Sequence, residues 1–290
     1  MTRPYEYRPA WFFVLAFVGS WGPWLLGLYL GSEPGLGRYA ALLNFMGLLG
    51  PMGATSVLVL TSGNVALQND LKGRLLELRR IRPLLAVLAV AMPLLVILLS
   101  IAISLWFGES TAQFGLAGGR DLVPLIILAL ILAPIYEETG WHGYGVDSLR
   151  ARNGVMEATF QFAVLWCAWH APLVLIPGTY QYGLARLDNK IYIANFFLGI
   201  IRAAVIANWF YYRNGRSVLA SILLHAMFNA ASVLINAAQF AKCIATLLYS
   251  AIAVGLVLGD QRLFAQAPRN FLTRRLRSAH LPHRRLRRRP

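Results

Sequence analysis

Cysteine is almost absent from the sequence. Cys167 and Cys243 are the only two, and each lies inside an apolar stretch. They supply neither a disulfide framework nor a CxxC metal-binding motif, so we interpret them as small buried packing residues. The sequence also has no HExxH motif, no GxSxG elbow and no glycine-rich phosphate loop. The commonest sequence motifs of zinc proteases, serine hydrolases and phosphate-binding enzymes are therefore missing.

Charged residues are also scarce, at 13% of the 290 residues, whereas 58% are apolar and the mean hydropathy is +0.56. A soluble domain of this size does not need so much apolar surface, so the composition predicts a polytopic membrane protein. We expect an all-α bundle of about eight transmembrane helices, because eight apolar runs have about the 20 residues that cross a bilayer. These runs cover residues 11–30, 39–60, 84–107, 122–144, 155–176, 191–212, 217–237 and 240–258.

The few acids leave a formal charge of +15, much of it at the C-terminal end. Ten arginines lie between Arg262 and Arg289, and no acid follows Asp260. A basic run that directly follows a hydrophobic segment is more simply a contact with anionic lipid, or an orientation signal, than a nucleic-acid site. We therefore divide the chain into a transmembrane domain over 1–260 and a basic cytoplasmic tail over 261–290, and expect no nucleic-acid partner.

Lysine and arginine are unevenly distributed over the connections between the apolar runs. Summed over alternate connections and both ends, 21 fall on one side and five on the other, or 11 and five without the tail. Because basic residues are enriched on the cytoplasmic side, we expect a multi-pass protein of the cell membrane with both termini cytoplasmic. The connection over 61–83 mixes leucines and arginines at helical spacing. It predicts a short amphipathic helix with its leucines in the interface and its arginines among lipid headgroups.

Two adjacent acids, Glu137 and Glu138, end the uncharged apolar run that begins at Leu122. Ionised groups are costly in such a place without a partner or a function, although a buried acid can simply pair with an arginine or a helix end. His142 follows Glu138 at a spacing of four, which places both residues on one helix face.

Two later apolar runs carry polar residues at the same spacing. Trp166 and His170 are four residues apart in one run, and His225 and Asn229 are four apart in another. A single histidine or asparagine of this kind can be a helix-to-helix hydrogen bond worth about 1 kcal/mol. Two acids, three histidines and an asparagine exceed what packing needs, and we expect them to meet in one interhelical cavity.

Hydrolysis is the chemistry that these residues suit, by one of two mechanisms. A glutamate in an apolar setting can take a proton from water beside a histidine, while a histidine and an asparagine donate to the developing oxyanion. Alternatively, glutamate and histidine side chains can hold a zinc ion with an open water position. The spacing fits both mechanisms.

The three polar motifs together resemble those of a known family. The run from Glu137 to Tyr144 resembles the EExxxR box of the CAAX prenyl protease and bacteriocin-processing (CPBP, or Abi) intramembrane proteases. The segment ending at His170 resembles their FxxxH box, and His225 to Asn229 resembles HxxxN. The resemblance is concentrated over residues 131–235.

The resemblance implies an intramembrane endopeptidase with eight helices. By position, it implies that Glu137 activates water with His170, that His225 and Asn229 bind the oxyanion, and that Glu138 supports or orients the site. The family is usually labelled as metalloprotease, so the resemblance also implies zinc. The metal-free mechanism described above stays open beside it. The residues that could bind zinc are Glu138, His142, His170 and His225.

Two positions depart from the family pattern. His142 stands where the family has arginine, so a permanent cation able to make two parallel hydrogen bonds is lost. Trp166 stands where phenylalanine is usual, which is a milder change of one aromatic for another. The first departure is also what a divergent or inactive member of the family would show.

Our hypothesis is that the chain hydrolyses a peptide bond in a membrane-associated protein or peptide. The alternatives are a proton-coupled membrane transporter and a catalytically inactive membrane scaffold. A transporter needs a polar path between the two faces of the membrane, yet the intramembrane polar groups cluster in one region. Arg202 is the only other charge predicted deep within a helix.

Overall fold

The computed structural model describes residues 5–118 and 127–272, and within them the chain is almost entirely helical. The longer helices are α1 (Pro9–Ser32), α2 (Gly37–Leu48), α3 (Gly50–Thr61), α4 (Val65–Leu76), α5 (Pro83–Leu105), α7 (Ala133–Gly140), α9 (Val155–His170), α11 (Ile191–Arg213), α12 (Val218–Val233) and α13 (Gln239–Gly259). Three short α-helices are α8 (Val146–Arg150), α10 (Tyr180–Arg186) and α14 (Gln261–Phe264). Single turns of other helix types cover Leu78–Arg80, Thr111–Phe114, Leu128–Leu132, Trp141–Gly145 and Ala171–Leu175.

The prediction of an all-α membrane bundle is confirmed, but the count of eight spans is not. Among the described residues five helices are long and apolar enough to cross a membrane, namely α1, α5, α9 with the turn after it, α11 and α13. The bent pair α2 and α3 forms a sixth if it is one span, and α12 is shorter. Each predicted run coincides with helix over most of its described residues, and 122–126 lie outside them.

The bend between α2 and α3 amounts to 50° and follows from two residues at the break. Pro51 occupies the first turn of α3, where its missing N–H costs nothing. Gly50 touches α1 so closely that a Cβ there would lie 2.1 Å from the Ser20 hydroxyl oxygen. The close approach of α1 to this break therefore requires glycine.

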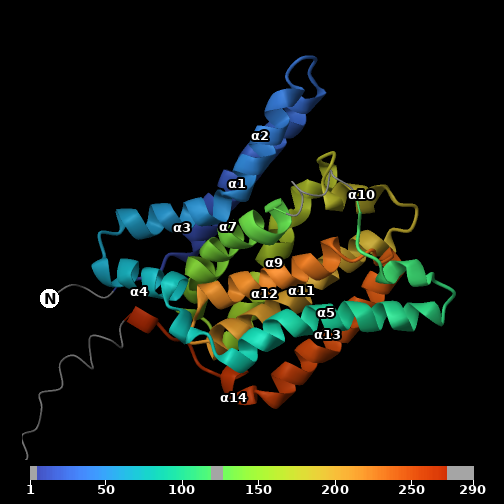
Figure 1. Cartoon of the computed structure of the whole chain (residues 1–290). Helices are drawn as coiled ribbons and strands as arrows, with labels where there is room; N and C mark the ends of the chain where they lie inside the picture. Colours follow the sequence, from blue (N-terminus) through green and yellow to red (C-terminus); the bar gives the residue numbers. More distant parts are fainter. Residues whose placement is uncertain (1–4, 119–126, 273–290) are drawn as a thin grey trace, which may run out of the picture.

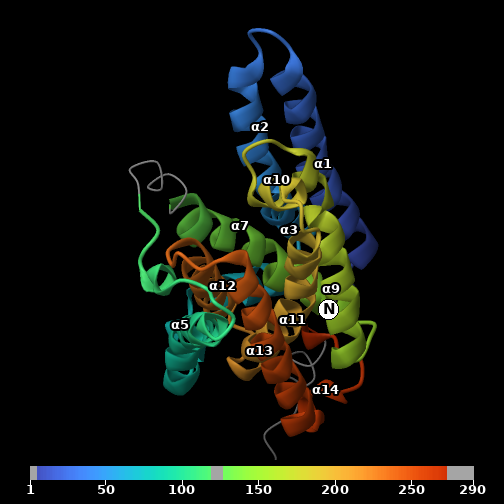
Figure 2. The ribbon, with the colours of Figure 1, turned by 90° about the vertical axis from the view of Figure 1, so that its right-hand side faces the viewer.

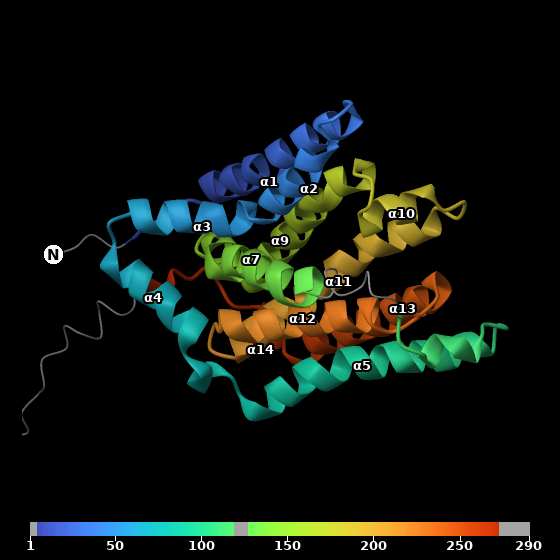
Figure 3. The ribbon, with the colours of Figure 1, turned by 45° about the horizontal axis from the view of Figure 1, so that its top comes forward.

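The helices pack as a bundle from which one hairpin projects. Helices α1 and α2 run side by side and extend beyond the remaining helices (Figures 1 and 2). Helices α5, α11, α12 and α13 pack together below them, and α9 packs on α11 (Figure 3). Helix α7, which carries the two adjacent glutamates, lies against α3 on one side and α12 on the other.

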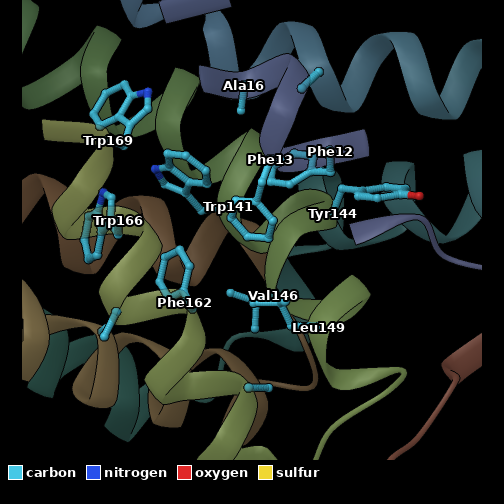
Figure 4. Packing of buried hydrophobic residues seen from close by; sticks show 14 of the residues in the cluster. Phe12, Phe13, Ala16, Trp141, Tyr144, Val146, Leu149, Phe162, Trp166 and Trp169 are labelled. Carbon is cyan, nitrogen blue, oxygen red and sulfur yellow. The ribbon is translucent and has the colours of Figure 1, made fainter. Parts of the chain in front are cut away.

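An aromatic core joins α1 and α9 to the segment that follows the glutamates (Figure 4). Phe13 of α1 stacks on Trp141, with ring centroids 6.2 Å apart. Phe162 stacks on Trp166 within α9 at 5.3 Å. Large apolar side chains are also abundant on the outside, including Trp106 at 85% exposed, as expected for a surface that faces lipid.

The segment after the glutamates is helical throughout but changes helix type. Residues Trp141–Gly145 form a π-helical turn between α7 and α8, and all five are buried. Such turns often occur at functional sites, because they shift side chains out of the α-helical register. Gly140, just before it, touches α3 so closely that a Cβ would lie 2.3 Å from the Pro51 Cβ. The glutamate-bearing helix is thus held tightly against α3.

The predicted amphipathic helix exists as α4, capped by the Asn64 side chain, which accepts from the Leu67 backbone N–H at 3.0 Å. The prediction that its arginines lie among lipid headgroups is wrong for Arg74, whose side chain is completely buried. The physical reason is a set of partners inside the bundle, because Arg74 is 3.3 Å from Asp147 and donates to the His142 and Gly143 carbonyl oxygens, while Asp70 accepts from it within α4 at 2.9 Å. Leu76 is 66% exposed, as an interfacial leucine should be.

The first residues of the predicted tail pack onto the bundle. Leu263 and Phe264 of α14 are buried, and so is Leu272. The Arg269 N–H donates to the Arg150 carbonyl oxygen at 3.0 Å. The rest of the predicted basic tail, 273–290, lies outside the described residues.

Candidate active site

A cavity of about 520 Å³ lies between α7, α9, α11, α12 and α13. The structure brings all five predicted catalytic residues to its wall, although they come from three helices. They are Glu137, Glu138, His170, His225 and Asn229. The predicted meeting in one interhelical cavity is therefore found for these five residues but not for His142, which the same prediction included.

Glu137 is held through one of its two carboxylate oxygens. Its Oε2 accepts hydrogen bonds from Trp141 Nε1 at 3.3 Å and Trp166 Nε1 at 3.1 Å. Its Oε1 makes no hydrogen bond to any other residue in 5–118 or 127–272. Because Glu137 lines the cavity, this oxygen is available to a water or substrate group there.

Glu138 differs from its neighbour because both of its oxygens are bonded. Its Oε1 lies 2.8 Å from His225 Nδ1, and its Oε2 is hydrogen-bonded to His142 Nδ1. Only 1% of Glu138 is exposed. Glu138 therefore links α7 to α12 and is less able than Glu137 to bind water.

His142 lies behind Glu138 and is completely buried, so it does not line the cavity. Its Nε2 lies 3.0 Å from Asn208 Oδ1, and Asn208 Nδ2 donates to Thr159 Oγ1 at 2.9 Å. Because the Asn208 oxygen faces the ring, His142 Nε2 carries a hydrogen and donates. Hydrogen bonds thus connect Glu138, His142, Asn208 and Thr159. In the sequence, Asn208 is visible only as a carboxamide within an apolar run.

His170 lines the cavity, and one of its two ring nitrogens is hydrogen-bonded within α9. Its Nδ1 donates to the Trp166 carbonyl oxygen at 2.8 Å, which makes Nε2 the hydrogen-bond acceptor of the neutral ring. The ring packs edge-on against Trp169 at 4.8 Å and against Phe196 at 5.5 Å between centroids. These contacts fix the direction of Nε2.

The four residues considered for zinc do not present free ligand atoms at one point in this arrangement. Both ring nitrogens of His142 and both oxygens of Glu138 already have hydrogen-bond partners. Over 5–118 and 127–272 no group of three or more histidine, cysteine, aspartate or glutamate side chains is positioned to hold a metal ion. This donor set therefore does not fit a zinc ion without rearrangement of side chains.

Below His142 lies a second buried polar group, which we call the Arg74 cluster: Asp70, Arg74, Asp147, Tyr211 and Arg216. Arg74 is 3.3 Å from Asp147, and Arg216 bridges Asp70 at 3.0 Å and Asp147. Burial alone would lower the pKa of the Arg74 guanidinium, but Tyr211, Asp147 and Asp70 outweigh it and raise this pKa. Arg74 is thus permanently charged.

The Arg74 cluster also holds the π-helical turn that carries His142. Arg74 Nη1 donates to the His142 carbonyl oxygen and Nη2 to the Gly143 carbonyl oxygen, both at 2.8 Å. Nothing in the sequence spacing connects Arg74 to this turn, since 68 residues separate Arg74 and His142. The cluster is therefore a part of the site's support that sequence reasoning missed.

Comparison with known proteins agrees with the motifs. Residues 119–231 match the family model described as type II CAAX prenyl endopeptidase Rce1-like. A protein of Methanococcus maripaludis named CAAX prenyl protease 2 is 34% identical over 269 residues, which are 91% of this chain and 98% of that protein. The chain therefore belongs to the CPBP family predicted from its motifs and is a multi-pass membrane protease.

Proposed function

We propose that this protease hydrolyses a peptide bond in a membrane-associated protein or peptide, with Glu137 as the base that activates water. The observation that carries the proposal is the unequal bonding of the Glu137 carboxylate. Two indole N–H groups hold Oε2, while Oε1 has no partner in the described ranges and belongs to a residue of the cavity wall. A general base must reach the proton that it abstracts, and an oxygen without a partner on a residue of the cavity wall supports this role.

His170 is the second group on the water. With Nδ1 donating to the Trp166 carbonyl oxygen, the neutral ring offers Nε2 as an acceptor. Water between Glu137 and His170 would be held by both, and its proton would pass to Glu137 Oε1 as the water oxygen attacks the peptide carbonyl. The same proton would then pass from Glu137 to the leaving amine as the C–N bond breaks and the carboxylic acid forms. The fixed ring orientation supports this positioning role.

His225 and Asn229 are the proposed donors to the oxyanion. They lie one turn apart on α12 and line the same cavity. Because His225 Nδ1 faces Glu138, its other nitrogen is left for the substrate, and the doubly protonated ring would donate from Nε2. Donors placed where negative charge develops stabilise the transition state. Glu138 supplies the counter-charge and holds His225 in place.

His142 takes the family arginine's place next to Glu138 in this proposal. Arginine would hold the carboxylate as a permanent cation, whereas His142 holds it through Nδ1 and is itself oriented by Asn208. The hydrogen-bonded chain from Glu138 to Thr159 therefore gives Glu138 a support of the kind that the family arginine would supply.

For the orientation we keep the prediction from the basic residues, with both termini cytoplasmic in the cell membrane and the tail against anionic lipid.

For the substrate, the name of the Methanococcus maripaludis relative suggests a prenylated CAAX protein. The alternative substrates are a peptide precursor and an unmodified membrane protein, whose hydrolysis would follow the same mechanism. Comparing the proteome of membranes containing the active protein with that of membranes containing a Glu137→Gln variant would identify which is cleaved.

Cleavage of a membrane-associated peptide by the purified protein tests the proposal. Glu137→Gln should lower kcat by about 10² to 10⁴-fold, which is the usual contribution of a general base. Glu157→Gln is the matched control, because Glu157 is an exposed glutamate of α9 outside the cavity. Cleavage that survives both Glu137→Gln and His170→Ala would contradict the assignment. Proton-driven solute flux in vesicles would instead favour the transporter alternative.

The zinc mechanism is kept as the second hypothesis, and metal analysis tests it. Metal content should be measured on protein purified without chelator and without added zinc. One zinc per active chain, lost together with activity on chelation, would favour the metal mechanism over water activated by Glu137 alone.

A further inference from the structure

Arg202 is a cation on the wall of the active-site cavity that the proposed mechanism does not use. It lies in the middle of α11 and lines the same cavity as Glu137 and His225. In the described part of the chain it has no ion pair, and its Nε is buried without a hydrogen-bond partner. Its guanidinium lies over the Tyr249 ring, with 4.2 Å between the guanidinium carbon and the ring centroid.

A charge at this depth is normally paired or faces a water-filled cavity, because an ion in an apolar environment loses its hydration. Arg202 follows the second pattern. The two glutamates of the cavity do not neutralise it, since neither forms an ion pair with it within 4.0 Å. A face of Tyr249 supports the cation but supplies no negative charge. The missing counter-charge is therefore one that a ligand in the cavity can bring.

The shape of the group indicates which ligand fits. A guanidinium presents parallel N–H donors that match the two oxygens of a carboxylate. Lys242, a second cation on the cavity wall, already lies 3.5 Å from the Tyr180 hydroxyl and over its ring. Of these two cations on the cavity wall, Arg202 is therefore the one that has no polar partner among the described residues.

We propose that Arg202 is the carboxylate-binding subsite of this protease. It would hold a carboxylate of the substrate peptide while the scissile bond lies beside Glu137. The inference rests on the proposed function and narrows its substrate class to peptides with a carboxylate near the cleaved bond. That carboxylate belongs either to the peptide's C-terminus or to an aspartate or glutamate side chain.

Binding to the uncleaving Glu137→Gln variant in lipid nanodiscs tests the inference. The probes are fluorescent peptides that share one apolar composition in randomised order. One form has a free C-terminal carboxylate, the second has a C-terminal amide, and the third has a C-terminal amide and one internal aspartate. We expect a form with a carboxylate to bind about tenfold more tightly than the plain amide, as one charge-assisted hydrogen-bonded pair can provide. The form that shows this preference identifies the source of the carboxylate.

Adding Arg202→Met should abolish the preference, and Arg202→Lys should retain part of it. Lys190→Met is the control, because the Lys190 ammonium donates to backbone carbonyls outside the cavity and its loss should leave the preference unchanged. No counter-ion is left unpaired by Arg202→Met, so the melting temperature should not fall.

Three results would overturn the inference. The first is equal binding of acid and amide forms, and the second is a preference that survives Arg202→Met. The third is an Arg202→Met variant that has a lower melting temperature and binds the acid and amide forms equally less tightly, as a purely structural arginine would give. Because binding is measured without hydrolysis, an acid preference in a protein that cleaves nothing would refute the proposed function and leave the subsite standing. Cleavage without an acid preference would refute the subsite and leave the proposed function standing.

Discussion

Two buried polar regions lie on either side of His142, and they differ in how their charges are balanced. In the Arg74 cluster each of two arginines is within 3.3 Å of an aspartate. In the cavity, Glu137 keeps one oxygen without a partner from the described residues, and Arg202 has no counter-ion there. Both regions bear the cost of burying charge, but only the first offsets that cost within the protein.

This difference indicates that the Arg74 cluster supports the structure and that the cavity carries out the chemistry. A fully paired buried cluster fixes backbone and adds little reactivity, whereas incompletely bonded charged groups in a cavity are available to a ligand. The two regions are joined at the π-helical turn, because Arg74 binds the backbone of His142 while the His142 ring binds Glu138. Changes in the Arg74 cluster should therefore act on stability, and changes at the cavity should act on catalysis.

The largest effect on stability is expected from Arg74→Met. The substitution removes one of the two arginines that pair with Asp70 and Asp147, and breaking a buried ion pair costs about 3–5 kcal/mol. The free energy of unfolding, measured by denaturation in detergent, should fall by that amount. Arg79→Met is the matched control, since the Arg79 side chain is 83% exposed and its loss should cost about 0.5 kcal/mol or less. Equal losses in the two variants would show that the cluster is not structural.

The second effect compares the two adjacent glutamates. Glu138→Gln removes the counter-charge of His225 and His142 but leaves Glu137 Oε1 in place. Misplacing the oxyanion donor should lower kcat by about 100-fold, as small displacements of catalytic groups do. Unlike Glu137→Gln, it should also lower the melting temperature, because Glu138 links α7 to α12. Steady-state cleavage and thermal unfolding of both variants measure this, and identical profiles would remove the distinction between base and support.

The third effect concerns Asn208, which we consider a positioning residue for His142. Asn208→Leu leaves His142 Nε2 without its acceptor in a buried place, at a cost of about 1–3 kcal/mol. We expect cleavage to fall about tenfold, mainly in kcat. Thr159→Val keeps the bond between Asn208 and His142 and should therefore have a clearly smaller effect on kcat. A Thr159→Val variant as impaired as Asn208→Leu would argue against positioning of His142.

The sequence predicted those parts of this arrangement that depend on local periodicity. Hydropathy located the helical runs, and spacings of four placed His225 with Asn229 and Glu138 with His142 on common faces. It did not predict the partners that come from distant segments. Arg74 was placed among headgroups because its neighbours are polar, but Asp147 and the carbonyls of the π-helical turn draw it inward. Length and hydropathy also did not reveal the 50° bend between α2 and α3 or the π-helical turn after the glutamates, and the predicted count of eight spans is not confirmed among the described residues.

The smallest effect should come from Trp166→Phe, which restores the aromatic residue usual in the family motif. The exchange of aromatic residues looks conservative in sequence, yet the Trp166 indole N–H donates to Glu137 Oε2 and phenylalanine has no donor. One of two hydrogen bonds to the base would be lost, which is worth about 1 kcal/mol and hence about fivefold in kcat. Trp141→Phe removes the longer bond, at 3.3 Å, and serves as the comparison. If Trp166→Phe and Trp141→Phe both cleave as fast as the unmodified protein, Glu137 is positioned by packing alone, and the contrast between its two oxygens has no catalytic meaning.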